Sequence, residues 1–296
     1  MTLITAYAFP AMGGTVEVQG AGAEGAARVE ALFARHEQIM SRFRPDSELC
    51  AVNASAGMWC QPSPTLARAL REAVWWMDAT DGVFDPTQLD ALEAAGYERS
   101  WPFAHAASQP LRPRPLARAI ELDAARGIRL TEGVRIDLGG IGKGFTVDRA
   151  IESLGPGANA LVDASGDLYA AGDCPDNRDT GEPGAGWVIG VHDPRTAEVE
   201  DIDIALLRVR NRGVATSGST KRRWSTPAGE RYHHLIDART APPSTRTCSP
   251  SPSSRPLPPP PTCWRRPRTC SAPSADWRSC SSTARTRWRS PPRASC

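Results

Sequence analysis

Four glycines, one carboxylate and one lysine stand close together in the middle of this 296-residue chain. They occupy residues 137–144, which read Asp-Leu-Gly-Gly-Ile-Gly-Lys-Gly. Glycine lets backbone N–H groups approach a ligand without interference from a Cβ atom. Lys143 can offer a point charge to a phosphate, and Asp137 is a hard oxygen ligand that suits Mg²⁺. The segment is therefore typical of a turn that handles phosphate groups.

The residues on either side predict how this turn is held. Val134 and Ile136 alternate with polar residues, as in a half-buried strand, and the apolar spacing over 145–154 predicts a helix. The turn would join that strand to the helix N-terminus, whose partial positive charge favours an anion. The spacing is neither that of a P-loop, which needs Ser or Thr directly after its Lys, nor that of a Rossmann fingerprint. The alternative, a tight turn in which Asp137 only caps the helix, stays open.

Composition and charge exclude several classes of protein. The chain contains no run of about 18 apolar residues, so we expect no membrane span. Its first ten residues have no basic region followed by a small-residue cleavage site, so we expect no signal peptide and a cytoplasmic protein. The first 240 residues hold 25 basic and 32 acidic residues, a net charge of −7. This acidic balance argues against a nucleic-acid partner, and the basic residues 221–223 are more typical of a solvated face.

Residues 241–296 have a different composition. They hold ten Arg and one Asp, 13 of the 27 Pro and five of the eight Cys, and they lack Gly, Val, Ile, Phe, Tyr and Glu. Such a segment cannot bury a core, so we predict one domain over 1–240 and an irregular or disordered tail over 241–296. This bias is also what a GC-rich gene yields in a wrong reading frame. We hypothesise a frameshift near residues 240–243; a natural basic tail is the alternative.

Before the tail, helices and short strands alternate irregularly. Helical spacing over 24–40, a Ser-Pro start at 63–64 and a further start at Asp85-Pro86 predict three helices. Short strands with turns are predicted over 120–136, and residues 160–169 form a strand, a turn and a strand. This order favours an α+β fold with mixed, mainly antiparallel sheets and packed helices over a doubly wound sheet.

Seven short motifs occur in the order and approximate spacing seen in the ApbE family of FAD:protein FMN transferases. Over roughly residues 8–240 the chain therefore resembles that family. The motifs are Met12-Gly-Gly-Thr15, Phe43-Arg-Pro-Asp-Ser-Glu48 with Asn53, Asp81-Gly-Val-Phe-Asp-Pro86, Asp137-Leu-Gly-Gly-Ile-Gly-Lys-Gly144 with Val147-Asp148, Ser165-Gly-Asp167, Ala215-Thr-Ser-Gly218 and His233-His-Leu-Ile-Asp237.

The resemblance implies a fold, a reaction and a set of site residues. Members of the family have an α+β fold, bind FAD and Mg²⁺, and transfer FMN from FAD to a Thr hydroxyl of a target flavoprotein, releasing AMP. Many are exported lipoproteins. By similarity, the metal would lie at Asp137 and the Gly140 position, and no catalytic base is assigned. The residues implied to line the FAD site are Met12, Phe43, Val83, Phe84, Asp85, Lys143 and Ile236.

Two alternative functions stay open. An FAD pyrophosphatase would use the same site with water in place of Thr and release FMN and AMP. A catalytically impaired flavin-binding protein would follow if the metal site is incomplete, because the family's second metal cluster, an Ala-Asp-x-x-x-Thr-like segment, is missing from 241–296. A zinc site is disfavoured, because His233 and His234 are adjacent and would face opposite sides of a strand.

Overall fold

The computed structural model describes residues 5–100, 119–175, 186–192, 203–216, 223–225, 231–234 and 253–255. The chain divides into two units, residues 1–257 and 258–296, and all the described residues belong to the first. Helices and antiparallel strands are interleaved along this unit, which confirms the predicted α+β class. Among the described residues, no helix is long and apolar enough to cross a membrane.

The main sheet draws its strands from distant parts of the sequence. Every neighbouring pair is antiparallel. One edge strand comes from the predicted tail, of which only these three residues are described. The strands, in spatial order, are β1 (Ala6–Ala11), β2 (Gly14–Gln19), β6 (Ala160–Ala164), β7 (Asp167–Ala171), β10 (Arg212–Ala215) and β13 (Ser253–Arg255).

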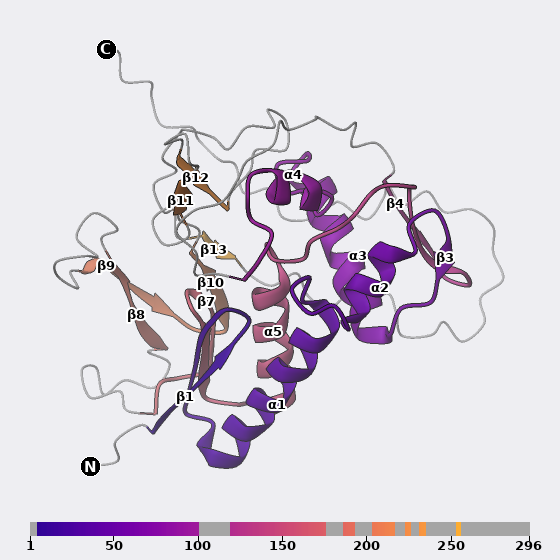
Figure 1. Cartoon of the computed structure of the whole chain (residues 1–296). Helices are drawn as coiled ribbons and strands as arrows, with labels where there is room; N and C mark the ends of the chain where they lie inside the picture. Colours follow the sequence, from indigo (N-terminus) through magenta and orange to yellow (C-terminus); the bar gives the residue numbers. More distant parts are fainter. Residues whose placement is uncertain are drawn as a thin grey trace, which may run out of the picture. The chain divides into compact units, whose positions relative to one another are not determined.

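Two helices pack side by side against this sheet, α1 (Gly22–Met40) and α5 (Gly142–Leu154) (Figure 1). α1 buries one stripe at helical spacing, through Ala26, Val29, Phe33 and Met40. The helix was predicted over 24–40, but from the spacing of Ala27, Leu32, Ala34 and Ile39, which lie on its more exposed side. Their shared core with the sheet consists of Phe9, Val16, Val18, Ala26, Val29, Phe33, Val147, Ala150, Val162 and Ala164.

A second core lies under α2 (Glu48–Ala54) and α3 (Pro64–Ala79). α3 begins as predicted, because the Ser63 hydroxyl accepts a hydrogen bond from the Leu66 N–H at 3.2 Å. The strands of this region form a three-stranded sheet in the order β3 (Trp59–Cys60), β5 (Gly127–Leu130), β4 (Ile120–Asp123).

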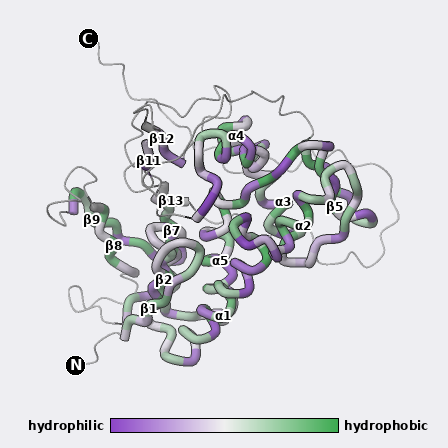
Figure 2. The backbone as a smooth tube through the Cα atoms, in the orientation of Figure 1, coloured by the Kyte–Doolittle hydropathy of each residue, from purple (hydrophilic) through white to green (hydrophobic). Residues whose placement is uncertain are grey.

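The remaining elements are short. Hydrophobic residues run along the two-stranded sheet of β8 and β9, as Figure 2 shows. Of its exposed side chains, Leu206 has 68% of its surface accessible. The remaining helix and strands of the described residues are α4 (Leu89–Ala94), β8 (Trp187–His192), β9 (Asp203–Val209), β11 (Arg223–Ser225) and β12 (Arg231–His233).

Two local predictions were wrong. Asp85-Pro86 does not begin a helix, because the Asp85 carboxylate accepts from the N–H of Thr87 and closes a turn, and α4 starts only at Leu89. Residues 134–136 belong to no strand, although short strands were predicted over 120–136. The backbone of Ile136 is instead paired by a side chain: Asn53 Nδ2 donates to its carbonyl at 2.9 Å, and its N–H donates to Asn53 Oδ1 at 2.8 Å.

Asn53 should therefore contribute more to stability than an ordinary half-buried amide. We expect Asn53→Ala to lower the free energy of unfolding by about 2 to 3 kcal/mol, because two backbone groups of Ile136 lose their partner. Gln61→Ala is the matched control, since its amide makes one exposed hydrogen bond to Ala125, and it should cost less than about 0.5 kcal/mol. Urea unfolding measures both. Equal losses would contradict the role given to Asn53.

Candidate functional site

The glycine turn leads directly into α5. The helix begins at Gly142, earlier than the apolar spacing predicted, so Lys143 and Gly144 lie in its first turn. Its N-cap residue is Ile141, and no side chain caps it, so Asp137 is not a capping residue. The first N–H groups of a helix lack partners within it and carry partial positive charge. At the start of α5 the Gly142 N–H already donates to the Leu138 carbonyl at 2.7 Å, so the Lys143 and Gly144 N–H groups are the ones that an anion could meet.

The turn packs closely against the loop before α4. A Cβ on Gly140 would lie 2.9 Å from Cε2 of Phe84, and a Cβ on Gly139 would lie 2.9 Å from Oδ2 of Asp137. The N–H of Asp137 also donates to the Pro86 carbonyl at 2.8 Å. The structure therefore brings the predicted residues Phe84, Asp137 and Gly140 together, and it shows why glycine occupies residues 139 and 140.

Asp85 and Val83, from the same loop, lie in different surroundings. Asp85 is buried, and its carboxylate accepts hydrogen bonds from the Thr87 hydroxyl and the Gln88 amide. The carboxylate is thus occupied in shaping the loop. Val83 is 56% exposed, which leaves its side chain accessible beside Phe84.

Lys143 extends from α5 to the turn between β6 and β7. Its Nζ donates to the Ala164 carbonyl at 3.1 Å and forms an ion pair with Asp167 Oδ2 at 2.8 Å. The neighbouring Ser165 has a φ of 58°, and its hydroxyl bonds both the N–H and the carbonyl of Thr15. These contacts place the β1–β2 and β6–β7 turns next to each other, near the start of α5.

A buried guanidinium links Asp137 to an aromatic cluster. The Arg42 side chain is 4% exposed, and its Nε lies 3.4 Å from Asp137 Oδ1. Its Cζ lies 4.1 Å from the ring centroid of Phe43 and 4.7 Å from that of Tyr97, and Nη2 donates to the Tyr97 carbonyl at 2.7 Å. Burial lowers the pKa of Arg42, while Asp137 acts to raise it. Trp224 continues the cluster on the other side of Tyr97.

Residues 12–251 match the model of the ApbE family. The chain belongs to the ApbE family. Among its relatives are FAD:protein FMN transferases of Treponema pallidum, 31% identical over 223 residues, and of Haemophilus influenzae, 28% identical over 228 residues. These alignments cover 71% and 72% of this chain but 60% and 62% of the relatives. The chain thus spans about three fifths of their length.

Solved structures agree with this membership. The ApbE protein of Thermotoga maritima superimposes with a TM-score of 0.69 at 27% identity, covering 81% of this chain and 78% of that one. The flavin transferase ApbE of Vibrio cholerae gives 0.65 at 20% identity, covering 81% and 78%, a likeness of fold. Mixed helices and antiparallel sheets in the order described are thus the ApbE fold.

The donors for a metal ion are fewer than the family pattern would suggest. Within the described residues, no group of three His, Cys, Asp or Glu side chains could hold a metal ion. Asp137 supplies one carboxylate, 18% exposed, in the same turn as the Gly140 backbone. One carboxylate with backbone oxygens suits Mg²⁺, which keeps water and substrate phosphate as its other ligands. Ile236 lies outside the described residues.

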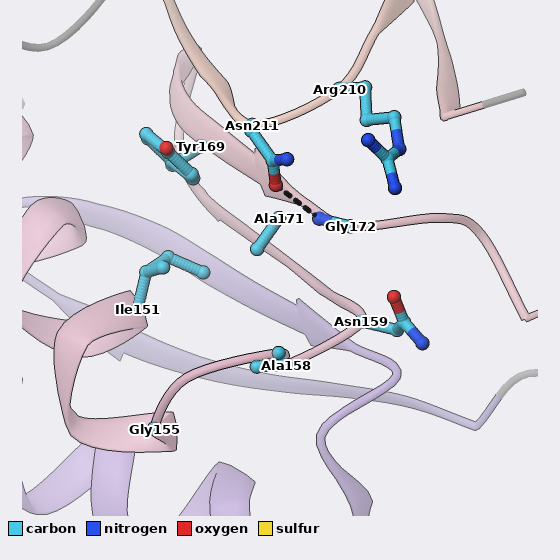
Figure 3. A pocket seen from close by; sticks show the side chains of 10 residues that line it. Ile151, Gly155, Ala158, Asn159, Tyr169, Ala171, Gly172, Arg210 and Asn211 are labelled. Atoms are coloured by element: carbon cyan, nitrogen blue, oxygen red, sulfur yellow. Dashed lines mark hydrogen bonds between the residues drawn. The ribbon is translucent and has the colours of Figure 1, made fainter. Parts of the chain in front are cut away.

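A pocket of 320 Å³ lies at the opposite end of α5 (Figure 3). It is lined by the end of the helix near Ile151, by Tyr169 of β7 and by Arg210 and Asn211 after β9. None of the residues implied for FAD or metal lines it. The pocket and the site at the start of α5 are therefore separate features of this ApbE chain.

A buried histidine supports the first turn of α5 from α1. His36 Nδ1 lies 3.0 Å from the Thr146 hydroxyl, which donates to the Gly142 carbonyl at 2.8 Å. Burial lowers the pKa of His36 from 6.5 to about 4. Further along α5, burial raises the pKa of Asp148 from 3.8 to about 7. Sequence reasoning missed the roles of His36 and Arg42, because a lone polar residue gives no pattern.

The tight contact between Gly140 and Phe84 generates a prediction with a control from the same motif. We expect Gly140→Ala to lower the free energy of unfolding by about 1 to 2 kcal/mol, because the Phe84 ring must move. Gly144→Ala should raise it by about 0.5 to 1 kcal/mol, since a Cβ there meets nothing within 4 Å and alanine favours the helix. Urea unfolding of both variants is the measurement. A stabilising Gly140→Ala would show that the contact is loose.

The shifted pKa values of His36 and Asp148 predict two contributions to the pH dependence of folding stability that oppose each other. The unfolded chain takes up a proton at His36 between pH 6.5 and about 4, so this contribution to stability is present above pH 6.5 and lost on acidification. For Asp148 the folded state holds the extra proton between pH 3.8 and about 7, so its contribution is lost as the pH rises through that range. Between pH 4 and 6.5 the two effects oppose each other.

Asp148→Asn should reveal the histidine effect. As the pH falls from 6.5 to about 4, the variant should lose stability faster than the parent chain, by up to about 1.4 kcal/mol per pH unit. The measurement is the urea midpoint across this pH range. His36→Gln is the control, because it keeps only the Asp148 contribution and should gain stability as the pH falls. Parallel curves for Asp148→Asn and the parent would contradict the assignment.

Proposed function

We propose that this chain transfers the FMN part of FAD to a Thr hydroxyl of a target flavoprotein, with Mg²⁺ bound, and releases AMP. The observation that carries the proposal is the packing of Phe84, from the loop before α4, against the 137–144 turn of an ApbE-family chain, which carries Asp137 and leads into Lys143 in the first turn of α5. The names of the relatives agree with this reaction.

The geometry supplies what the transfer needs. Attack on a pyrophosphate builds negative charge on the phosphoryl oxygens, which positive charges and backbone donors stabilise. The Lys143 and Gly144 N–H groups in the first turn of α5 and the Lys143 ammonium would be such donors. Asp137, with a backbone oxygen at Gly140, would hold the Mg²⁺, which when bound neutralises part of that charge. Arg42 keeps the Asp137 carboxylate in place.

The aromatic side of the site supports the choice of a flavin substrate. Phe43 is partly buried and packs against the buried Tyr97 with ring centroids 5.7 Å apart, so of these two rings Phe43 is the one that a ligand could reach, and the Phe84 ring lies over Gly140. Aromatic rings bind flat, apolar ring systems through stacking and edge contacts. An aromatic cluster and a phosphate-binding helix start, joined through Arg42 and Asp137, match the two chemically different parts of FAD.

The test is the release of AMP from FAD, followed by chromatography with and without Mg²⁺. An acceptor protein with its Thr is compared with the same acceptor carrying Ala. We expect Mg²⁺-dependent AMP and flavin-labelled acceptor only with the Thr form. Free FMN with unlabelled acceptor would favour the pyrophosphatase, and bound FAD without turnover would favour a flavin-binding protein. A chain with its tail in the restored reading frame, assayed in parallel, tests the frameshift hypothesis.

Lys143 generates a quantitative prediction for the same assay. Lys143→Met should raise the KM for FAD about 10-fold to 100-fold, because a charge-assisted hydrogen bond to phosphate is lost. The control is Arg126→Gln, which removes a cation that lies beside Trp59, outside the site. An unchanged KM in Lys143→Met would remove this lysine from the substrate site.

A further inference from the structure

The turn between β1 and β2 adopts a conformation that its sequence disfavours. Ala11 pairs with Gly14, so Met12 and Gly13 form a two-residue hairpin turn. Their φ angles are 50° and 72°, both positive as in a type I′ turn. Asn-Gly is the usual sequence there, and a left-handed conformation costs a residue such as Met about 1 to 2 kcal/mol. Strain of this kind is a pointer to function.

The partner of this turn is also in an unfavourable place. Glu37 lies in the last turn of α1, where the partial negative charge of the helix end disfavours a carboxylate. No basic residue occupies this turn to offset it. Glu37 Oε2 accepts a hydrogen bond from the Met12 N–H at 3.0 Å, across 25 residues of sequence. The left-handed Met12 and the carboxylate at the C-terminal end of α1 are each locally unfavourable, and one hydrogen bond joins them. Such a combination is expected at a functional site.

This hydrogen bond fixes a residue at the edge of the proposed FAD site. The Met12 side chain packs against both core clusters, so its backbone conformation decides where the turn lies. The turn adjoins the Thr15–Ser165 contact, and the next residues along the β6–β7 turn hold Lys143. A shift of the Met12 backbone would thus move the part of the site that lies beside the β6–β7 turn, which contacts Lys143.

We propose that Glu37 is a positioning residue for the flavin nucleotide, acting through Met12. It holds Met12 in the left-handed conformation, so that the turn presents a fixed surface to FAD. The inference rests on the proposed function together with the family resemblance, by which Met12 would line the FAD site. In this role Glu37 acts by placing an acceptor oxygen within hydrogen-bonding distance of the Met12 N–H. Its negative charge does not contribute to binding, because a negative charge near a bound diphosphate would weaken it.

Substitutions that separate reach from charge test this role. Glu37→Gln keeps the acceptor and removes the charge, whereas Glu37→Asp keeps the charge and is one methylene too short. The dissociation constant for FAD is measured on the full chain with Mg²⁺ by flavin fluorescence. We expect Glu37→Asp to weaken binding at least fivefold and Glu37→Gln to remain within twofold of the parent. Gln38→Ala, which only loses contacts to Asp46, should leave binding unchanged.

The outcomes are distinct. Tight binding by Glu37→Asp, or equal weakening in both Glu37 variants, would overturn the positioning role while leaving the proposed function intact. Failure of the parent chain to bind FAD would instead overturn the proposed function. Circular dichroism confirms folding, and hydrogen exchange at the Met12 amide, expected to be faster in Glu37→Asp at unchanged global stability, separates a positioning effect from general destabilisation.

Discussion

The site depends on close packing at two glycines. A Cβ at residue 139 would press on an Asp137 carboxylate oxygen, and a Cβ at residue 140 would press on the Phe84 ring, so either side chain would have to shift. This contact brings the loop before α4 against the turn before α5. It also places the carboxylate, the aromatic ring and the helix start within one small region. A larger side chain at residue 140 would push against the Phe84 ring and disturb this arrangement.

Charge balance follows from the same packing. The Asp137 side chain is only 18% exposed, and a carboxylate in such a place needs a partner. Arg42 provides it, and the guanidinium is in turn accommodated by the Phe43 and Tyr97 rings and the Tyr97 carbonyl. A buried guanidinium with satisfied hydrogen bonds adds little to the free energy of folding, but it fixes the positions of the groups that it contacts. The aromatic cluster and the glycine turn are therefore held in fixed relation.

Patterned segments could be predicted from the sequence, whereas tertiary partners could not. α1, α3 and the strands around Ser165 followed from apolar spacing, capping residues and turn residues, which act over a few positions. α2 has only seven residues, too few to show a period, and the pairing of Ile136 comes from Asn53, 83 residues away. The seven motifs of the site could be recognised together in the sequence. The contacts of Arg42 with Asp137 and of Glu37 with Met12 could not, because they join residues that only the fold brings together.

The most direct measurement of the central claim, that FAD binds around the start of α5, is hydrogen exchange of the full chain with and without FAD and Mg²⁺. The account predicts slower exchange in three separate segments, residues 11–15, 84–87 and 138–144, and no change in the pocket residues 155–159. Slower exchange at 155–159 with none at 138–144 would place the ligand at the other end of the helix and contradict the account.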